Sequence, residues 1–224
     1  MMMIVFTILT YFLYLFSKKV YGKIPFPIFQ PLLLAPILLI MLITIMHVSA
    51  NQYLEDAKWL SHMLGPATIA FAVPIYKHFS TIKKYMVTIL ISITTGTLVA
   101  IFSTYLLSKL IHLNSDFLIS ILPRSITTPI AIEVSKEIGG LPTLTTVFVI
   151  ITGVMGGVVG PAVLKWLSIK TPIAKGLALG MGAHGVGTNK AMEYGKQEEV
   201  FSSIAMIFAA FITLGWGTLF ILFI

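Results

Sequence analysis

Long runs of residues without any charged side chain dominate this chain. Each run is close to or above the roughly 17–25 residues that an α-helix needs to cross a lipid bilayer. Short segments that contain lysine separate most of these runs. The pattern predicts an all-α polytopic membrane protein with about six full transmembrane helices. The charge-free runs cover residues 1–17, 24–54, 59–76, 85–108, 138–164 and 200–224.

Two further segments are apolar but interrupted. Residues 117–132 contain Pro123, Arg124 and Pro129, and residues 180–189 contain four glycines and His184. Prolines and clustered glycines disrupt a regular helix, and non-helical backbone at membrane depth is tolerated where it lines a cavity. We therefore predict two broken helices that meet inside the membrane.

Each broken segment either crosses the membrane or re-enters it as a hairpin. Lys18, Lys19 and Lys23 follow the first span, which places the N-terminus outside the cell, because lysines accumulate on the cytoplasmic side. Two hairpins leave only Lys58, Lys109 and Lys136 outside, whereas two crossings move three more lysines out and bring Lys136 in. The lysine distribution therefore favours two re-entrant hairpins. The three lysines that distinguish the arrangements are Lys165, Lys170 and Lys175.

Composition indicates one membrane domain over residues 1–224. Hydrophobic residues make up 57% and charged residues 10% of the chain, against about 25% charged residues in soluble proteins. The net charge of +7 lies in loop lysines, which indicates orientation in the membrane and no nucleic-acid partner. The chain has no cysteine and no nucleotide, metal or hydrolase motif, so we expect no enzyme activity, no cofactor and no metal.

The two broken segments also define internal repeats. We expect N-terminal helices in residues 1–112 and two hairpin-plus-helix units in residues 113–224, inverted with respect to each other. Inverted repeats whose unwound segments meet at the membrane midplane are typical of secondary transporters. The aligned pairs include Pro66 with Pro123, Gly96 with Gly153, Thr128 with Thr188, and Glu133 with Glu193.

Arg124 is the only arginine of the chain and the only charged residue between residues 117 and 132. A guanidinium at membrane depth is costly unless it is paired or lies in a polar cavity. Its planar fork can bind a carboxylate through two hydrogen bonds, which a lysine cannot do. We interpret Arg124 as the ligand of a small organic anion. A structural ion pair with Glu133 or Glu193, or an anchor at the membrane interface, is the alternative.

Hydroxyl and backbone groups complete the predicted site. The glycines allow a ligand to approach backbone N–H groups. His184 is a ligand, a proton carrier or a structural residue. Glu133 and Glu193, each three residues before a lysine, are salt-bridged residues or further candidates for proton coupling. The predicted substrate-binding residues are Arg124, Ser125, Thr127, Thr128, His184, Gly185, Thr188 and Asn189.

Both broken segments resemble the LrgB/CidB family of bacterial membrane proteins. The resemblance covers nearly the whole chain, and the intact Arg-Ser-Ile-Thr-Thr-Pro makes it closest to the CidB-like branch. The sequences that carry it are Pro-Arg-Ser-Ile-Thr-Thr-Pro-Ile-Ala at 123–131, Ile-Gly-Gly at 138–140, Thr-Gly at 152–153, Thr-Pro-Ile-Ala-Lys-Gly-Leu-Ala-Leu-Gly at 171–180 and Gly-Ala-His-Gly-Val-Gly-Thr at 182–188.

The resemblance implies one of two functions. Bacterial members are described as modulators of murein hydrolase activity and autolysis that act with a small holin-like LrgA/CidA partner. Relatives, including a plant plastid envelope protein, carry small monocarboxylates such as glycolate, glycerate or pyruvate. Because a pore needs no buried arginine, we expect a monocarboxylate carrier that acts with an LrgA/CidA-like partner, with the holin/antiholin-like modulator as the alternative. We also expect a dimer in the bacterial cell membrane.

Overall fold

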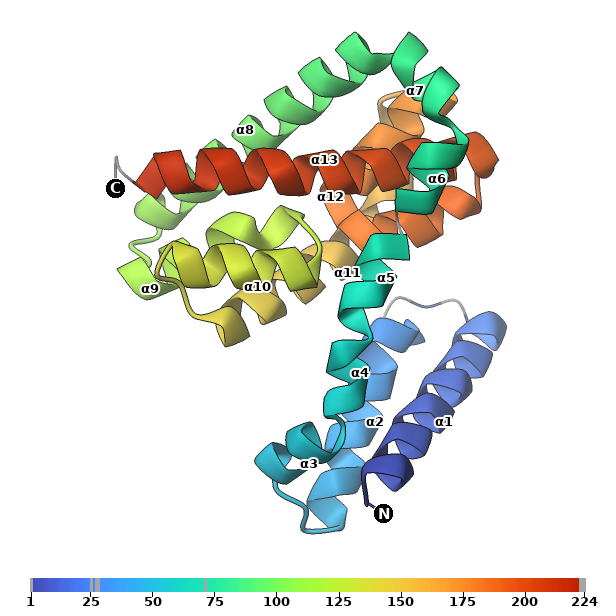
Figure 1. Ribbon diagram of the computed structural model, residues 1–224, viewed down its shortest axis with the longest axis vertical. Coiled ribbons are helices and arrows are strands. Elements are labelled where there is room, and N and C mark those ends of the chain that lie inside the picture. The colour runs from blue at the N-terminus through green and yellow to red at the C-terminus, as the bar shows by residue number, and fades with distance from the viewer. Residues whose placement is uncertain (1, 25, 27–28, 71, 222–224) are drawn as a thin grey trace. The chain divides into compact units, whose positions relative to one another are not determined.

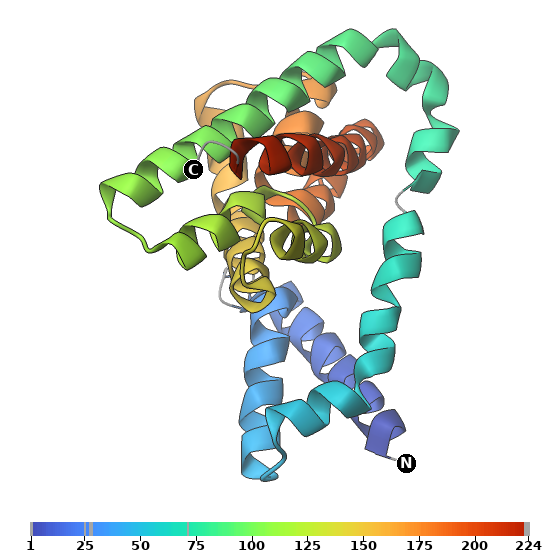
Figure 2. The same cartoon turned by 60° about the vertical axis from the view of Figure 1, so that its left-hand side comes forward.

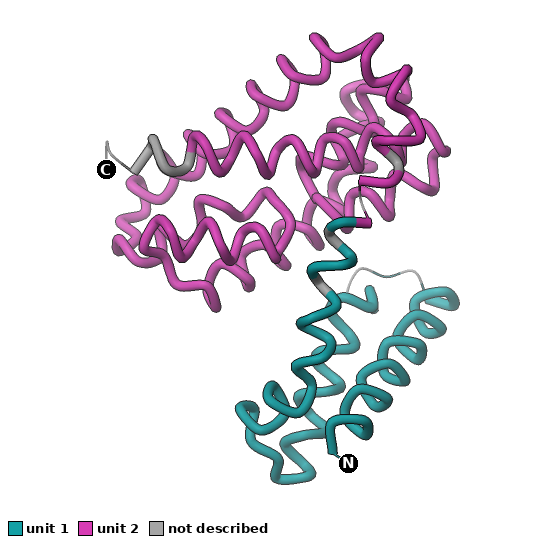
Figure 3. The backbone as a smooth tube through the Cα atoms, viewed as in Figure 1, with its two compact units in different colours: residues 1–69 teal, residues 70–224 magenta. Residues whose placement is uncertain are grey.

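The computed structural model describes residues 2–24, 26, 29–70 and 72–221, and every regular element among them is a helix. The all-α prediction is therefore confirmed. Contacts within the chain divide it into two compact units, residues 1–69 and residues 70–224 (Figure 3). Residues 222–224, the end of the last predicted span, lie outside the described residues.

The first unit folds around a sharp bend after its second helix. The α2 helix ends at Ile45, His47 after it adopts a positive φ of 54°, and the chain bends by 115° between α2 and α3. Tyr53 stabilises this bend, because its ring packs edge-on against Phe6 at 5.6 Å and its hydroxyl lies 2.8 Å from that of Thr10. The helices are α1 (Met2–Lys23), α2 (Pro31–Ile45), α3 (Ala50–Asp56), α4 (Lys58–His62) and α5 (Leu64–Ala70).

The second unit contains the remaining helices. Its core lies where α8, α12 and α13 contact one another (Figures 1 and 2). Ile89, Ile93, Phe201 and Ile204 are fully buried there. The helices are α6 (Ala72–Lys77), α7 (Phe79–Lys84), α8 (Met86–Leu110), α9 (Ser115–Ile121), the short 3-10 helix η2 (Leu122–Ser125), α10 (Thr128–Glu137), α11 (Pro142–Trp166), α12 (Pro172–Met192) and α13 (Lys196–Ile221).

Four helices in the described residues are long and apolar enough to cross a membrane: α1, α8, α11 and α13. The bent pair α2 and α3 raises the number to 5 if it is one span. Residues 59–76, predicted to cross, instead contain the short helices α4, α5 and α6. The structure thus supports a polytopic membrane protein and does not confirm the count of six spans.

The segment around Arg124 folds as a hairpin of residues 115–137, the first hairpin, with α9 and α10 as its arms (Figure 1). Ser120 of α9 and Ser135 of α10 lie side by side, because Thr145 contacts both. The Thr145 hydroxyl donates to the Ser120 carbonyl oxygen at 2.9 Å and hydrogen-bonds with Ser135 Oγ at 2.7 Å. Pro129 in the first turn of α10 removes an N–H that has no partner in a helix anyway. Pro123 and Arg124 lie at the tip.

The glycine-rich segment, α12, folds as a second hairpin over residues 172–192. It reverses at His184, whose φ of 40° and ψ of −121° are not helical. Leu179 and Ala191 therefore belong to one buried cluster, although they would lie about 18 Å apart along a straight helix. Gly187 touches the Leu179 carbonyl so closely that no side chain fits between the arms.

Each hairpin precedes a long helix, α11 or α13. The glycine face of α11 packs against the second hairpin: Gly153 contacts His184, and Gly156 contacts Gly182 and Ala183. This agrees with the close helix packing expected of such glycines. The inverted orientation of the two units, and their arrangement as a transporter, stay predictions.

Candidate functional site

The tips of both hairpins contact the same short stretch of α11. Arg124 Nη1 donates to the Thr152 hydroxyl at 3.4 Å. His184 Nε2 donates to the carbonyl oxygen of Val149 at 3.0 Å, and its ring lies on Gly153. One helical turn of α11 therefore fixes two residues that the sequence singled out.

Arg124 lies among hydroxyl groups. Its Nε donates to Thr104 Oγ1 of α8 at 3.1 Å, and Thr104 in turn donates to the Ala100 carbonyl oxygen at 2.7 Å. In the described part of the chain, Nη2 has no hydrogen-bond partner and no carboxylate lies within ion-pair distance of the guanidinium. Nη2 is thus the nitrogen of the guanidinium that is left without a protein acceptor among the described residues.

The two glutamates proposed as partners of Arg124 pair with lysines instead. Glu133 binds Lys136 at 2.8 Å, and Glu193 binds Lys190 at 2.7 Å, both at exposed positions. The sequence predicted a lysine three residues after Glu193, whereas the structure uses the lysine three residues before it. This geometry gives no support to the structural ion pair of Arg124.

A cavity of about 350 Å³, the inner cavity, connects the two hairpins. Ser125 at the first tip and Gly182 of the second hairpin line it together. Thr97 of α8 and Thr213 of α13 also line it, and their buried hydroxyl oxygens have no hydrogen-bond partner among the described residues. The remaining lining residues are Gly96, Val99, Ala100, Ile126, Ala178, Met181 and Ala209.

The other predicted site residues lie around these tips. Thr127 is buried and its hydroxyl oxygen has no hydrogen-bond partner in the part of the chain that the structure describes, while Thr128 begins α10 and is half-buried. Thr188 is buried and hydrogen-bonds to the His184 carbonyl and to Ser202 Oγ, so it joins the hairpin to α13. Gly185 is half-buried and Asn189 is exposed.

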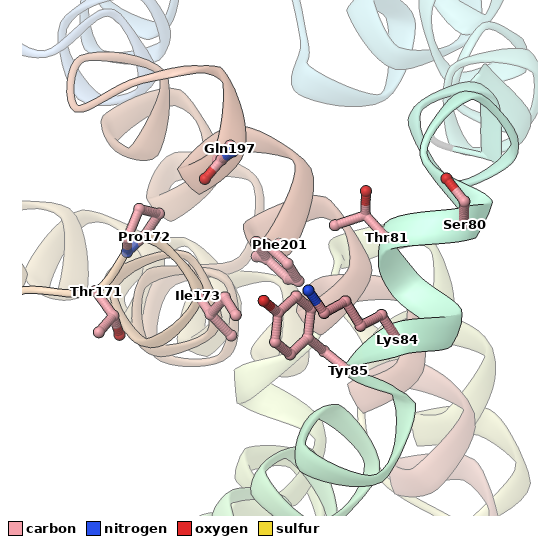
Figure 4. A pocket seen from close by; sticks show the side chains of 9 residues that line it. All are labelled: Ser80, Thr81, Lys84, Tyr85, Thr171, Pro172, Ile173, Gln197 and Phe201. Carbon is pink, nitrogen blue, oxygen red and sulfur yellow. The ribbon is translucent and has the colours of Figure 1, made fainter.

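A second cavity, the lysine mouth, has a volume of about 590 Å³ and carries the charged group of Lys84 (Figure 4). The Lys84 ammonium lies 5.4 Å from the Tyr85 ring centroid, a cation–π distance. Because Lys84 and Thr171 line one cavity, the basic segments 77–84 and 165–175 lie at the same end of the second unit. The other lining residues are Ser80, Thr81, Pro172, Ile173, Gln197 and Phe201.

The two cavities lie along the same three helices. The lysine mouth is at the N-terminal ends of α8, α12 and α13, and the inner cavity lies farther along each of them. Helical rise separates the cavities by about 12–20 Å along these helices. Leu177 and Ile204 belong to the buried cluster at these helices, between the two positions. Along the contact of α8, α12 and α13, the seam, the lysine mouth lies at one end and the inner cavity lies beside the hairpin tips. Apolar side chains separate the two cavities.

Sequence reasoning missed the threonines that surround the guanidinium and the cavity. Thr97 and Thr152 were visible only as small residues beside glycines, which indicate helix packing. Nothing in the sequence distinguished Thr104 and Thr213 from other helix residues, because helix periodicity does not reveal which helix lies against which hairpin tip. The missed residues are Thr97, Thr104, Thr152, Thr213 and Lys84.

Known proteins resemble this chain over almost its full length. The sequence pattern of the LrgB-like family matches residues 10–223. A Bacillus subtilis (strain 168) protein named "Uncharacterized protein YwbG" is 45% identical over 92% of either chain. A Staphylococcus epidermidis protein named "Holin-like protein CidB" is 36% identical over 92% of this chain and 90% of its own. No solved structure matches the chain.

Proposed function

Because this chain belongs to the LrgB-like family, we propose that it is a holin-like protein of the bacterial cell membrane that modulates murein hydrolase activity. The observation that carries the proposal is the 36% identity, over nine-tenths of both chains, to proteins named holin-like. The four long apolar helices are what such a membrane protein needs. We propose a small LrgA/CidA-like membrane protein as its partner and a homodimer as its assembly.

The surface for such partners is not the glycine face of α11. Gly153, Gly156 and Gly160 are covered within the chain by His184, Gly182 and Leu179 of the second hairpin. Small residues that promote helix association in membranes are therefore already used for internal packing. Association with another membrane protein would use other lipid-facing helices.

Release of a fluorescent dye from proteoliposomes tests the holin-like function. We expect a dye of several hundred daltons to leave vesicles that contain the purified protein together with its small partner. Vesicles with either protein alone serve as controls. Vesicles that retain the dye under every condition would contradict a holin-like pore.

A second function is favoured by the surroundings of Arg124. A carrier of small monocarboxylates would bind the carboxylate on the free edge of the guanidinium, next to Ser125 and the inner cavity. Thr104 and Thr152 would hold the guanidinium in place while the substrate occupies that edge. Thr127, Thr128 and the second hairpin, including Gly185, Thr188 and Asn189, would shape the site, and His184, Glu133 or Glu193 would couple protons.

Uptake into proteoliposomes separates the two functions. A carrier gives saturable uptake of labelled pyruvate, glycolate or glycerate, and a pH gradient changes its rate if protons are coupled. A holin-like pore gives dye release without saturation. Saturable uptake by vesicles that retain the dye would establish the carrier, whereas dye release without saturable uptake would exclude it.

A further inference from the structure

The lysine mouth lies where three helices of the second unit begin. Its lining residues Tyr85, Thr171 and Gln197 lie at the N-terminal ends of α8, α12 and α13. Both α8 and α13 are long and apolar enough to cross a membrane, and the exposed apolar side chains of α8 begin with Val87, three residues after Lys84. The mouth therefore lies at the edge of the membrane-spanning part of this unit, at the level of the lipid headgroups.

Two aromatic rings hold the ammonium group of Lys84 at this cavity (Figure 4). Phe201 belongs to the core, and its ring packs edge-on against the ring of Tyr85 with the centroids 6.2 Å apart. The Lys84 ammonium lies 5.4 Å from the centroid of the Tyr85 ring, where the cation and the ring attract each other. Because a core residue positions Tyr85 and Tyr85 positions Lys84, the positive charge has a defined place in the cavity.

Hydrogen-bond donors surround this charge. Ser80, Thr81 and Lys84 line the cavity from α7, where residues three and four apart are neighbours on one helix face. The Thr171 hydroxyl accepts the backbone N–H three residues later at 3.3 Å, which leaves its own proton to donate. Gln197 adds an amide group. This set of donors suits a group that carries several acceptor oxygens.

The charge of the mouth is positive and has no carboxylate beside it. Within the described ranges, no acidic side chain lines the cavity and Lys84 forms no ion pair. Glu198 follows the lining residue Gln197, but its side chain is buried and its carboxylate lies beside Gly195. The basic segments 77–84 and 165–175 add further positive charge at this end of the unit. The complementary ligand is therefore an anion.

We propose that the lysine mouth binds the phosphate group of an anionic phospholipid from the surrounding membrane. Lys84 pairs with the phosphate, the hydroxyls of Ser80 and Thr81 donate to its oxygens, and the acyl chains leave along Val87 and Ile91, which are exposed on α8. The volume of about 590 Å³ lies within the range of ligand pockets, about 300–1,000 Å³. Basic pockets between membrane-spanning helices bind anionic headgroups on the cytoplasmic side, which is where the lysine distribution places this end. Binding of this lipid requires neither a pore nor a carrier.

Two short-chain lipids test the site on the full-length protein purified in a neutral detergent. Dioctanoyl phosphatidylglycerol and dioctanoyl phosphatidylcholine have the same acyl chains, but only the first has a net negative charge. A ligand that binds the folded protein raises its unfolding temperature, so titration of each lipid measures its binding. We expect phosphatidylglycerol to act at a concentration about fivefold lower than phosphatidylcholine, the preference that one lysine near an anionic lipid provides.

Substitutions of two neighbouring lysines then locate the charge. Lys84→Gln should remove the preference for phosphatidylglycerol, and Lys84→Arg, which keeps the charge, should retain it. Lys83→Gln is the matched control, because Lys83 is an exposed residue of the same helix that does not line the cavity. It should leave the preference unchanged. The unfolding temperature of each variant without lipid verifies that the protein is folded.

Two results would overturn the site: equal binding of the two lipids by the wild type, or the same loss of preference in Lys83→Gln as in Lys84→Gln. The second result would mean that diffuse surface charge attracts the lipid. Sodium phosphate, compared with sodium chloride at the same ionic strength, distinguishes a lipid from a free anion. Inorganic phosphate should not raise the unfolding temperature. A rise that Lys84→Gln abolishes would assign the mouth to free phosphate and reject the phospholipid.

Discussion

The guanidinium of Arg124 makes hydrogen bonds that a lysine cannot reproduce. Its Nε and Nη1 reach Thr104 on α8 and Thr152 on α11 at the same time, and Nη2 remains for a ligand. If a carboxylate binds there, Arg124→Lys should reduce flux per folded molecule tenfold or more, because hydrogen bonds to charged groups contribute about 1.5–3 kcal/mol each. Uptake by proteoliposomes with a measured protein content gives this number. Normal flux in a well-folded Arg124→Lys protein would exclude bidentate binding.

His184 combines an unfavourable backbone conformation with a favourable side-chain contact. Its φ of 40° is one that glycine adopts far more readily, while its imidazole donates to Val149. The unfolding temperature in detergent should therefore be highest for the wild type, lower for His184→Gly and lowest for His184→Ala. Both variants lose the imidazole, but only alanine keeps the backbone strain, which amounts to about 1–3 kcal/mol. An alanine variant as stable as the glycine variant would show that the tip is not strained.

At the residue scale, sequence analysis identified residues whose chemistry differs from that of their neighbours along the chain. Arg124 was recognisable because no other charge occurs nearby, and His184 because glycines surround it. Their partners Thr104, Thr152 and Val149 come from other helices and look like ordinary apolar-segment residues. Only the folded chain shows which hydroxyls face the guanidinium, so the neighbours of Arg124 and His184 could not be predicted.

At the element scale, glycines set how closely the second hairpin approaches α13. Gly180 lies against the Ser202 backbone and Ala205, whereas Gly182 has open space beside it. Gly180→Ala should destabilise the protein by about 1–3 kcal/mol through overpacking, and Gly182→Ala should not lower its stability, because alanine favours helix more than glycine does. Unfolding temperatures of the two variants make the comparison. Equal effects of the two substitutions would contradict this packing.

The breaks in both hairpins were predictable, because Pro123, Pro129 and the glycines of residues 180–187 interrupt apolar runs. In the first hairpin, the arms pack side by side through Ser120, Ser135 and Thr145. The mutual contacts of these residues have no local sequence signal. For residues 59–76 the prediction from the sequence was wrong. Their apolar run predicted a span, but the structure divides it into short helices, and the run contains Gly65, Pro66 and Pro74.

For the whole molecule, the position of the lysine mouth bears on topology. Lys84 and Thr171 line one cavity, so the segment that precedes α8 and the loop that follows α11 lie at one end of the unit. We expect Ser168→Cys to resist an impermeant maleimide added to intact cells and Ser115→Cys, on the predicted outer side, to react. Both serines are exposed. Rapid external labelling of Ser168→Cys would restore the arrangement in which the broken segments cross.

The contacts among α8, α12 and α13 differ in whether they join two backbones or a backbone and a flexible side chain. Gly176 and Gly180 place the second hairpin directly on the backbone of α13, so we expect these two elements to move together. Across the same hairpin, Gly96 of α8 meets the end of the flexible Met181 side chain. Any opening of the inner cavity should therefore occur as α8 slides over this soft contact. A covalent crosslink between α8 and α12 should therefore hold the protein in one conformation, whereas a crosslink between α12 and α13 should have no effect.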